Sequence, residues 1–141
     1  MEPVVERETV LDAPPEEVWD ALAAPDTWLA DSGSLPLEPG GEGHLVEDGR
    51  SRTAVVEEVE PGHRLVYRWW DDDDLDDVSR VEISLVGAPA GGTRVVVREW
   101  AIAGGVLDAR GVVAPASDGG AWDRRITWLS FEASARSLVG V

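Results

Sequence analysis

Glu99 is the residue whose position in the sequence best suits acid–base chemistry. It belongs to the run Thr93–Ile102, which reads TRVVVREWAI and is typical of a strand. Successive side chains of a strand point to opposite faces, so Glu99 shares a face with Val95 and Val97. A carboxyl group between such valines could act as a general acid or base toward a ligand. Two alternatives stay open: Glu99 pairs with an arginine of a neighbouring strand, or the opposite face of the run, which carries Trp100, is the inner one.

Tyr67 is a second candidate for contact with a ligand. It lies in the run Leu65–Asp71, LVYRWWD, where Leu65, Tyr67 and Trp69 share one face. The other face also holds an aromatic residue, so alternation alone does not decide which face is buried. We expect the face of Tyr67 to point inward, where its hydroxyl could hydrogen-bond a ligand. Plain packing is the alternative, because the main contribution of an aromatic side chain is its buried area.

The sequence holds little that could bind a metal or a cofactor. His44 and His63 are the two histidines and cysteine is absent, whereas a metal centre needs three or four converging ligands. The acidic run 71–77, DDDDLDD, lacks the spacing, central glycine and final glutamate of a calcium-binding EF-hand loop. We expect it to be a solvated hairpin loop. No phosphate-binding glycine loop or nucleophile motif occurs, so we expect no metal and no cofactor.

The charge of the chain excludes several classes of partner. Its 141 residues include 28 acidic and 12 basic residues, all of the latter arginine, for a net charge of −16. Nucleic acids and anionic membranes are bound through basic surfaces, so neither is expected. The length suits a single domain, residues 1–141. The N-terminus lacks an apolar signal segment and no run of 18 apolar residues occurs, so we expect a soluble, cytoplasmic protein.

Strand and helix signals follow one another in an order that predicts an α+β fold. Val4–Leu11 is a first strand, and a short helix begins at Pro15, because proline is favoured at the first helical position. A second short helix is expected at Thr27–Asp31, capped by Asp26. Further strands separated by short turns should pair as an antiparallel meander. They are Gly43–Glu47, Thr53–Glu60, Leu65–Asp71, Val78–Val86 and Thr93–Ile102.

A long helix is expected at Ala121–Val139. Trp128 and Phe131 lie off its main apolar face, as in a helix held by a curved sheet or in one that also contacts a second subunit. Residues 103–120 are rich in glycine yet hold several aliphatic side chains, so part of this segment should pack onto the domain and could cover a pocket mouth. The main apolar stripe of the helix consists of Trp122, Ile126, Leu129 and Ala133.

These segments together resemble the START/Bet v 1-like (SRPBCC) superfamily. The resemblance covers Val4–Val139 and rests on the order of APPEEVWDAL, VEEVEPGHRLVYRWW, SRVEISL, GGTRVVVREW and a Trp-x3-Ile-x2-Leu tail. The most similar branch is that of small bacterial proteins like the C-terminal domain of the heat-shock protein 90 ATPase activator. The resemblance implies a helix-grip fold, in which a curved antiparallel sheet of about six strands surrounds the C-terminal helix and encloses an apolar cavity. Members bind lipids, sterols or polyketides, and some cyclise or dehydrate polyketides.

The combined prediction is a domain that binds a small hydrophobic or aromatic ligand in an internal cavity. One alternative is a polyketide cyclase- or dehydratase-like enzyme with Glu99 or Tyr67 as acid–base residue, its catalytic residues being otherwise unassigned. Another is an interaction protein, whether a co-chaperone-like or regulator-associated domain or a homodimer, that uses an exposed apolar patch with Trp128 and Phe131. The expected cavity wall comprises Trp28, Tyr67, Trp69, Ile83, Val97, Glu99, Trp122, Ile126 and Leu129.

Overall fold

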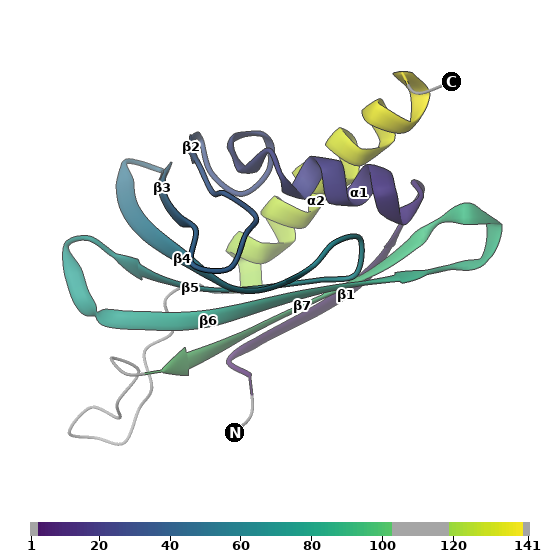
Figure 1. Cartoon of the computed structure of the whole chain (residues 1–141). Coiled ribbons are helices and arrows are strands. Elements are labelled where there is room, and N and C mark those ends of the chain that lie inside the picture. Colours follow the sequence, from purple (N-terminus) through teal and green to yellow (C-terminus); the bar gives the residue numbers. More distant parts are fainter. Residues whose placement is uncertain (1–2, 103–118, 140–141) are drawn as a thin grey trace.

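The fold is a curved antiparallel sheet whose concave face holds the C-terminal helix (Figure 1). The computed structural model describes residues 3–102 and 119–139. Its seven strands are hydrogen-bonded in the order β1-β7-β6-β5-β4-β3-β2, which confirms the predicted helix-grip architecture. The strands are β1 (Val5–Leu11), β2 (Ser32–Ser34), β3 (Glu42–Glu47), β4 (Arg50–Glu60), β5 (Arg64–Asp71), β6 (Asp74–Gly87) and β7 (Thr93–Ile102). The helices are α1 (Pro15–Leu22) and α2 (Gly119–Val139), with 3₁₀ turns η1 (Pro25–Thr27) and η2 (Pro89–Gly91).

Strand β2 is the one element that the sequence did not indicate. Its residues are serine and glycine, which have low strand propensity, so the strand forms through its pairing with β3. Gly33 lies opposite Leu45 and has a φ of +126°. A Cβ atom at Gly33 would lie 2.1 Å from the carbonyl oxygen of His44. Only glycine therefore lets the chain approach β3 this closely.

The second short helix lies earlier than the predicted range Thr27–Asp31. It is the 3₁₀ turn η1, which begins at Pro25 and has no side-chain cap from Asp26. Proline suits the first helical position because its φ is fixed and it has no N–H group to satisfy. The turn places Trp28 directly after it, with the indole ring 6.5 Å from that of Trp122 on α2.

The acidic run 71–77 forms a tighter hairpin than the predicted loop. Strand β5 extends to Asp71 and β6 begins at Asp74, and these two residues pair across the turn. Asp71 is buried and accepts hydrogen bonds from the guanidinium group of Arg50. In the turn, Asp72 accepts hydrogen bonds of 2.6 and 2.7 Å from two hydroxyl groups of β4. The expectation of a solvated loop is therefore wrong for Asp71, because strand pairing carries it into the sheet.

This hairpin should contribute to the loss of stability in acid. The backbone N–H of Asp73, followed by the guanidinium group of Arg50, lowers the pKa of Asp71 below its ordinary value. A lowered pKa stabilises the fold above the unfolded-state value, about 3.9 for aspartate, and that contribution is lost as the pH falls through the folded-state value. We expect Asp71→Asn to be less stable than the wild-type at neutral pH, with the difference shrinking below about pH 4. Urea unfolding at a series of pH values checks this, and a difference that stays constant with pH would contradict it.

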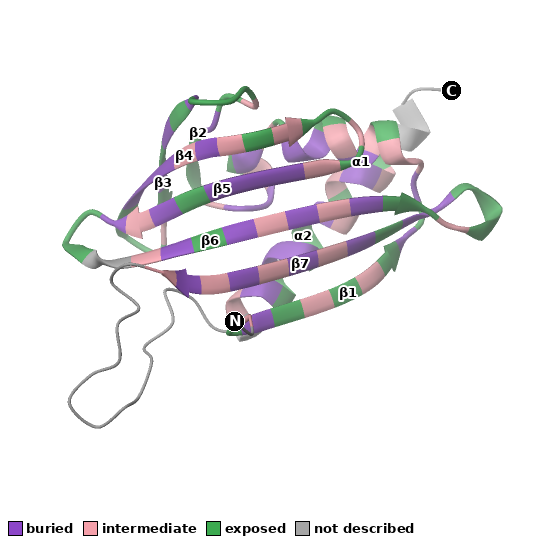
Figure 2. Cartoon of the chain, turned by 60° about the horizontal axis from the view of Figure 1, so that its bottom comes forward, coloured by how far each residue is buried: buried purple, intermediate pink, exposed green. Residues whose placement is uncertain are grey.

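The inner faces of the sheet and of α2 are those predicted from the alternation of side chains. Figure 2 shows buried and less buried positions alternating along β7. Helix α2 begins at Gly119, slightly before the predicted start, and the rest of the segment 103–120 lies outside the described residues. The buried inner residues are Leu65, Tyr67 and Trp69 on β5, Val95, Val97 and Glu99 on β7, and Trp122, Ile126, Leu129 and Ala133 on α2.

Candidate functional site

The residues predicted to line a cavity come together between the sheet and α2. All nine are buried, and all except Glu99 belong to one hydrophobic cluster. The ring of Trp69 lies 6.0 Å from that of Trp122 and meets Tyr67 edge-on at 5.5 Å. With Trp28, which contacts Trp122, these residues form what we call the aromatic cluster. Most of the predicted wall thus packs together as core, and Trp28 is the member of the cluster that lines the surface hollow described below.

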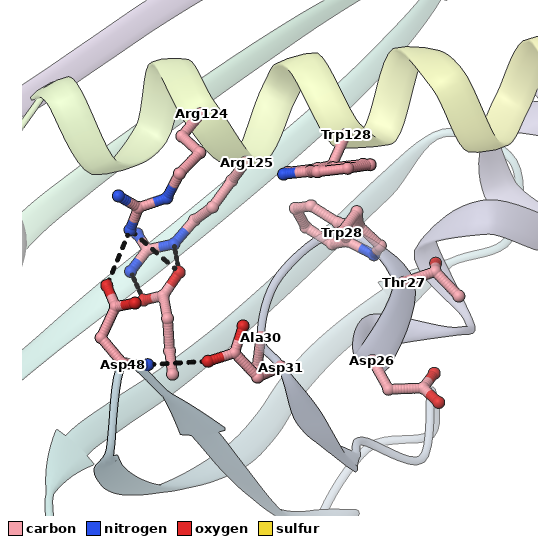
Figure 3. Close-up of a pocket in the computed structure, with 10 residues that line it drawn as sticks. Asp26, Thr27, Trp28, Ala30, Asp31, Asp48, Arg124, Arg125 and Trp128 are labelled. Atoms are coloured by element: carbon pink, nitrogen blue, oxygen red, sulfur yellow. Dashed lines mark hydrogen bonds and ion pairs between the residues drawn. The ribbon is translucent and has the colours of Figure 1, made fainter.

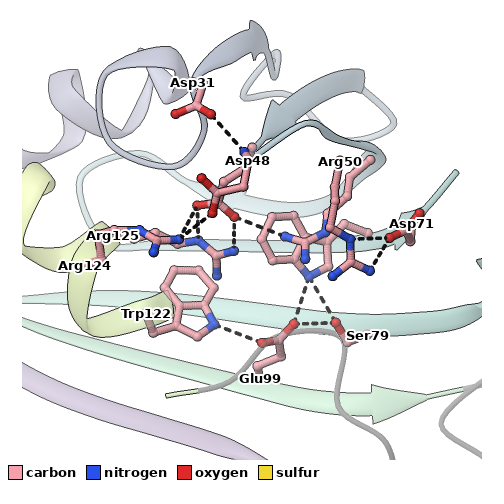
Figure 4. Close-up of polar contacts among 12 residues, drawn as sticks. Asp31, Asp48, Arg50, Asp71, Ser79, Glu99, Trp122, Arg124 and Arg125 are labelled. Carbon is pink, nitrogen blue, oxygen red and sulfur yellow. Dashed lines mark hydrogen bonds and ion pairs between the residues drawn. The ribbon is translucent and has the colours of Figure 1, made fainter. Parts of the chain in front are cut away.

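Glu99 lies at the floor of the aromatic cluster. Its carboxylate accepts a hydrogen bond of 2.8 Å from Nε1 of Trp69 on β5 and one of 2.9 Å from Nε1 of Trp122 on α2. The hydroxyl of Ser79 on β6 is a third donor (Figure 4). These donors are buried, where an unpaired N–H or O–H group would be costly. Through these hydrogen bonds, Glu99 of β7 connects helix α2 to strands β5 and β6.

A second cluster of polar residues lies in the same interior. Its members are not among the site residues predicted from the sequence. Arg125 of α2 is 1% exposed and donates two hydrogen bonds to Glu47 at the end of β3, from Nε at 3.1 Å and from Nη2. Arg52 of β4 forms an ion pair of 3.5 Å with the same carboxylate. Two largely buried guanidinium groups thus share one carboxylate, and we call the three residues the arginine bridge.

The arginine bridge packs directly on the aromatic cluster. The Cζ atom of Arg125 lies 4.7 Å from the ring centroid of Trp122 and 5.0 Å from that of Trp69. The Cζ atom of Arg52 lies 4.5 Å from the centroid of Trp69. Cations over indole faces are attracted by the ring quadrupole, more strongly when water is excluded. Burial, and next the charge of Arg125, lowers the pKa of Arg52, yet arginine stays charged at any physiological pH.

Three buried polar atoms in this region have no hydrogen-bond partner among the described residues. They are Nε1 of Trp28, the hydroxyl oxygen of Tyr67 and Nη1 of Arg125. Burial raises the pKa of Tyr67, so its hydroxyl stays protonated. Each of the three groups can therefore donate a hydrogen bond. A buried donor without an acceptor costs about 1–3 kcal/mol, so the cluster favours the arrival of a group that can accept these bonds.

A hollow of about 360 Å³ opens beside two of these donors (Figure 3). Trp28 and Arg125 form part of its wall, and Trp128 lies over it from α2. At its rim, Arg124 forms an ion pair of 3.2 Å with Asp48, and Asp31 accepts a hydrogen bond of 2.9 Å from the backbone N–H of Asp48. The remaining lining residues are Asp26, Thr27, Ala30 and Glu47. The hollow therefore combines the indole surface of Trp128 with a charged rim, and the two unpartnered donors lie buried directly behind its wall.

One signal in the sequence could have pointed to Arg125. It lies three residues after Trp122 and one before Ile126, inside the apolar stripe of α2, where a charged side chain must be buried. Its partner Glu47 is 78 residues away in the sequence. No local pattern connects two such positions, and charged residues are usually exposed. Sequence periodicity alone therefore could not pair them.

The fold and the interior of this chain define it as a helix-grip domain. A comparison with protein-family models matches residues 12–122 to the family described as Activator of Hsp90 ATPase homolog 1-like protein. Because the match covers most of the chain, the protein belongs to this family. A search of the curated proteins found no match. Within the described part of the chain, no helix has the length and apolar character needed to cross a membrane.

Solved structures share the fold at low sequence identity. MLL2253 from Mesorhizobium loti is 22% identical with a TM-score of 0.76, and the match covers 93% of this chain and 96% of that protein. DynU16, a protein of the dynemicin biosynthetic locus, is 23% identical with a TM-score of 0.74, covering 94% of this chain and 48% of DynU16. CalU16 from Micromonospora echinospora is 20% identical with a TM-score of 0.62, covering 95% and 83%. The chain thus spans about half the length of DynU16, and these likenesses show the fold alone.

Proposed function

We propose that this protein binds a small, neutral aromatic ligand that carries an oxygen acceptor, in the hollow between η1, the β3–β4 turn and α2. The observation that carries the proposal is the pair of buried, unpartnered donors in the hollow wall, Nη1 of Arg125 and Nε1 of Trp28. Both donor groups are already removed from water in the folded chain. A ligand that accepts their hydrogen bonds gains that interaction without a further desolvation cost on the protein side.

The walls of the hollow suit an aromatic ring. Trp128, which is 53% exposed, offers an indole surface over the hollow (Figure 3), and Trp28 lies buried behind its wall; aromatic rings favour offset or edge-to-face contact with such a surface. A volume of about 360 Å³ lies at the small end of the range for ligand pockets, about 300–1,000 Å³. The size favours a compact ligand over a long acyl chain.

The charges around the hollow favour a neutral ligand over an anion. Asp26, Asp31, Glu47 and Asp48 line it, against two basic residues, Arg124 and Arg125. The whole chain has a net charge of −16, so its field repels anions at a distance. Arg125 is held by Glu47, which directs the free Nη1 group and offsets its charge. A carbonyl or phenol oxygen fits these conditions better than a carboxylate does.

The arrangement of Glu99 favours ligand binding over acid–base catalysis. Three buried donors already occupy its carboxylate, and Glu99 does not line this hollow. A general base needs to reach the proton that it removes. The helix-grip fold and the description of DynU16 as a protein of a biosynthetic locus support a role with a small molecule.

The proposal can be tested with matched naphthalene derivatives. We expect acetylnaphthalene to raise the melting temperature and to bind about tenfold more tightly than isopropylnaphthalene, which has a similar shape but no acceptor, since one hydrogen bond contributes about 1.4 kcal/mol. Naphthoate should bind more weakly than acetylnaphthalene. Isothermal titration calorimetry gives the affinities.

Two arginine variants of α2 show whether the preference for the ligand with an acceptor depends on the Nη1 group of Arg125 or on any arginine of this helix. Arg125→Lys keeps the charge but removes the planar Nη1 group, so the preference for acetylnaphthalene over isopropylnaphthalene should fall to about twofold or less. Arg136→Lys, on the same helix but paired with Glu132, should keep the preference. Equal binding of the two naphthalenes to the wild-type protein, or no binding of either, would refute the proposal.

A further inference from the structure

Helix α2 carries an aromatic ridge on its outer side, made of Trp128 and Phe131. The two side chains are 53% and 65% exposed, and their ring centroids lie 6.0 Å apart. Single exposed apolar residues are common on protein surfaces, but adjacent exposed aromatic residues are typical of protein–protein interfaces. The ridge stands on a regular helix, so its shape is preset before any partner arrives.

A hollow of about 280 Å³ lies beside this ridge, between α2 and β1. Val10 and Leu11 of β1 and Ile126 of α2 form its apolar wall, and Phe131 stands at its border. The ridge and the hollow therefore lie side by side on one continuous surface.

We propose that this surface joins two copies of the chain in a symmetric dimer, with the ridge of each copy in the hollow of the other. In a two-fold symmetric interface both copies use the same patch. The patch of each copy must therefore contain both the protrusion and a depression that receives the protrusion of the other copy. The ridge and its neighbouring hollow meet this condition. A two-fold axis that runs between the ridge and the hollow places the ridge of each copy in the hollow of the other. Trp128 also borders the ligand hollow, whereas Phe131 does not, so Phe131 is the residue of the ridge that tests the dimer apart from ligand binding.

The distribution of charge favours a second copy as the occupant of this surface. Strand β1 and helix α2 together carry four acidic residues (Glu6, Glu8, Asp123 and Glu132) and, apart from the buried Arg125, three basic ones (Arg7, Arg124 and Arg136), so their outer residues have a net charge of −1 in a chain of −16. Ion pairs of 2.8 Å join Arg7 to Asp123 and Arg136 to Glu132. Elsewhere two copies of so acidic a chain repel each other. At β1 and α2 this repulsion is much weaker, because the local charge is close to zero.

The place of β1 in the sheet agrees with this interface. It is the terminal strand of the sheet, next to β7. An edge strand offers backbone groups to foreign strands unless something covers it. A dimer through the ridge and the hollow covers the side of β1 that faces α2.

The test is the molar mass in solution, measured by sedimentation equilibrium over a wide range of protein concentration. We expect the wild-type chain to be a reversible dimer. Phe131→Asp and, independently, Trp128→Asp should each raise the dimer dissociation constant at least about tenfold, since buried aromatic residues dominate such interfaces. Circular dichroism should show an unchanged fold, because both side chains are exposed.

Leu75→Asp is the matched control. Leu75 is 69% exposed in the β5–β6 hairpin, away from β1 and α2, so this variant should dimerise like the wild-type. A wild-type chain that stays monomeric at every concentration would overturn the proposal, including the case in which the ridge binds a different protein. A dimer that survives in both aspartate variants of α2 would place the interface elsewhere and would overturn it as well.

Discussion

Replacing Glu47 with glutamine should lower the free energy of unfolding by about 3–5 kcal/mol, which is typical when one partner of a buried ion pair is removed. The loss is large because Glu47 serves two buried guanidinium groups at once, in addition to the exposed one of Arg124 at 3.6 Å. The side chains of Arg125 and Arg52 are 1% and 8% exposed, so water cannot replace the missing charge. Their mutual repulsion, which Glu47 now offsets, would remain in the folded chain.

Urea unfolding at neutral pH measures this effect. Glu132→Gln is a suitable control, because Glu132 pairs with Arg136 one turn away on the partly exposed side of α2. Such helical pairs contribute about 0.2–0.5 kcal/mol, so the control should stay close to the wild-type. If Glu47→Gln is no more destabilising than the control, the arginine bridge does not hold α2 against β3 and β4.

Replacing Glu99 with alanine should cost about 2–5 kcal/mol, since it leaves two of the three buried donors to its carboxylate without any acceptor, at about 1–3 kcal/mol each before relaxation. Nε1 of Trp122 and the hydroxyl of Ser79 lose their acceptor, whereas Nε1 of Trp69 keeps the hydroxyl oxygen of Ser79 at 3.0 Å. Part of the loss is recovered if the core contracts or admits water. The near-ultraviolet circular dichroism of the tryptophans should weaken too, because their rings lose a fixed orientation.

Two variants show whether the hydrogen bonds carry this effect. Glu99→Gln keeps the side-chain volume but turns one acceptor oxygen into a donor, so it should fall between the wild-type and Glu99→Ala. Glu8→Ala changes an exposed glutamate of β1, next to β7, and should cost no more than about 0.5 kcal/mol. A stability of Glu99→Ala close to that of Glu8→Ala would show that Glu99 is dispensable for the attachment of α2.

Much of the fold was predictable because its signals are local. The alternation that placed Tyr67 and Glu99 on inner faces depends only on the pleat of a strand. The stripe that begins at Trp122 depends only on the helical period. The hairpins were predictable from the few residues of each turn. The prediction failed where pairing overrode local preference, as in the serine–glycine strand β2 and at Asp71, which β5 and β6 carry into the sheet.

The candidate site was predictable only in part. Trp28, Tyr67, Trp69 and Trp122 were found because large aromatic side chains on inner faces must be buried together. The arginine bridge was missed, although it supplies the donor on which the proposed ligand depends. Glu47, Arg52 and Arg125 come from β3, β4 and α2; Glu47 and Arg52 each resemble an ordinary surface charge, and the position of Arg125 within the apolar stripe does not reveal its partners.

The order of residues in this chain therefore decides which segments become strands and helices and which side of each is apolar, because propensity and periodicity act over a few neighbouring residues. The tertiary structure alone decides that Arg125 meets Glu47 and that Glu99 receives two indole N–H groups. The reason is physical: a charged group is buried only where distant segments supply its partners, and those partners meet only once the sheet has curved around α2.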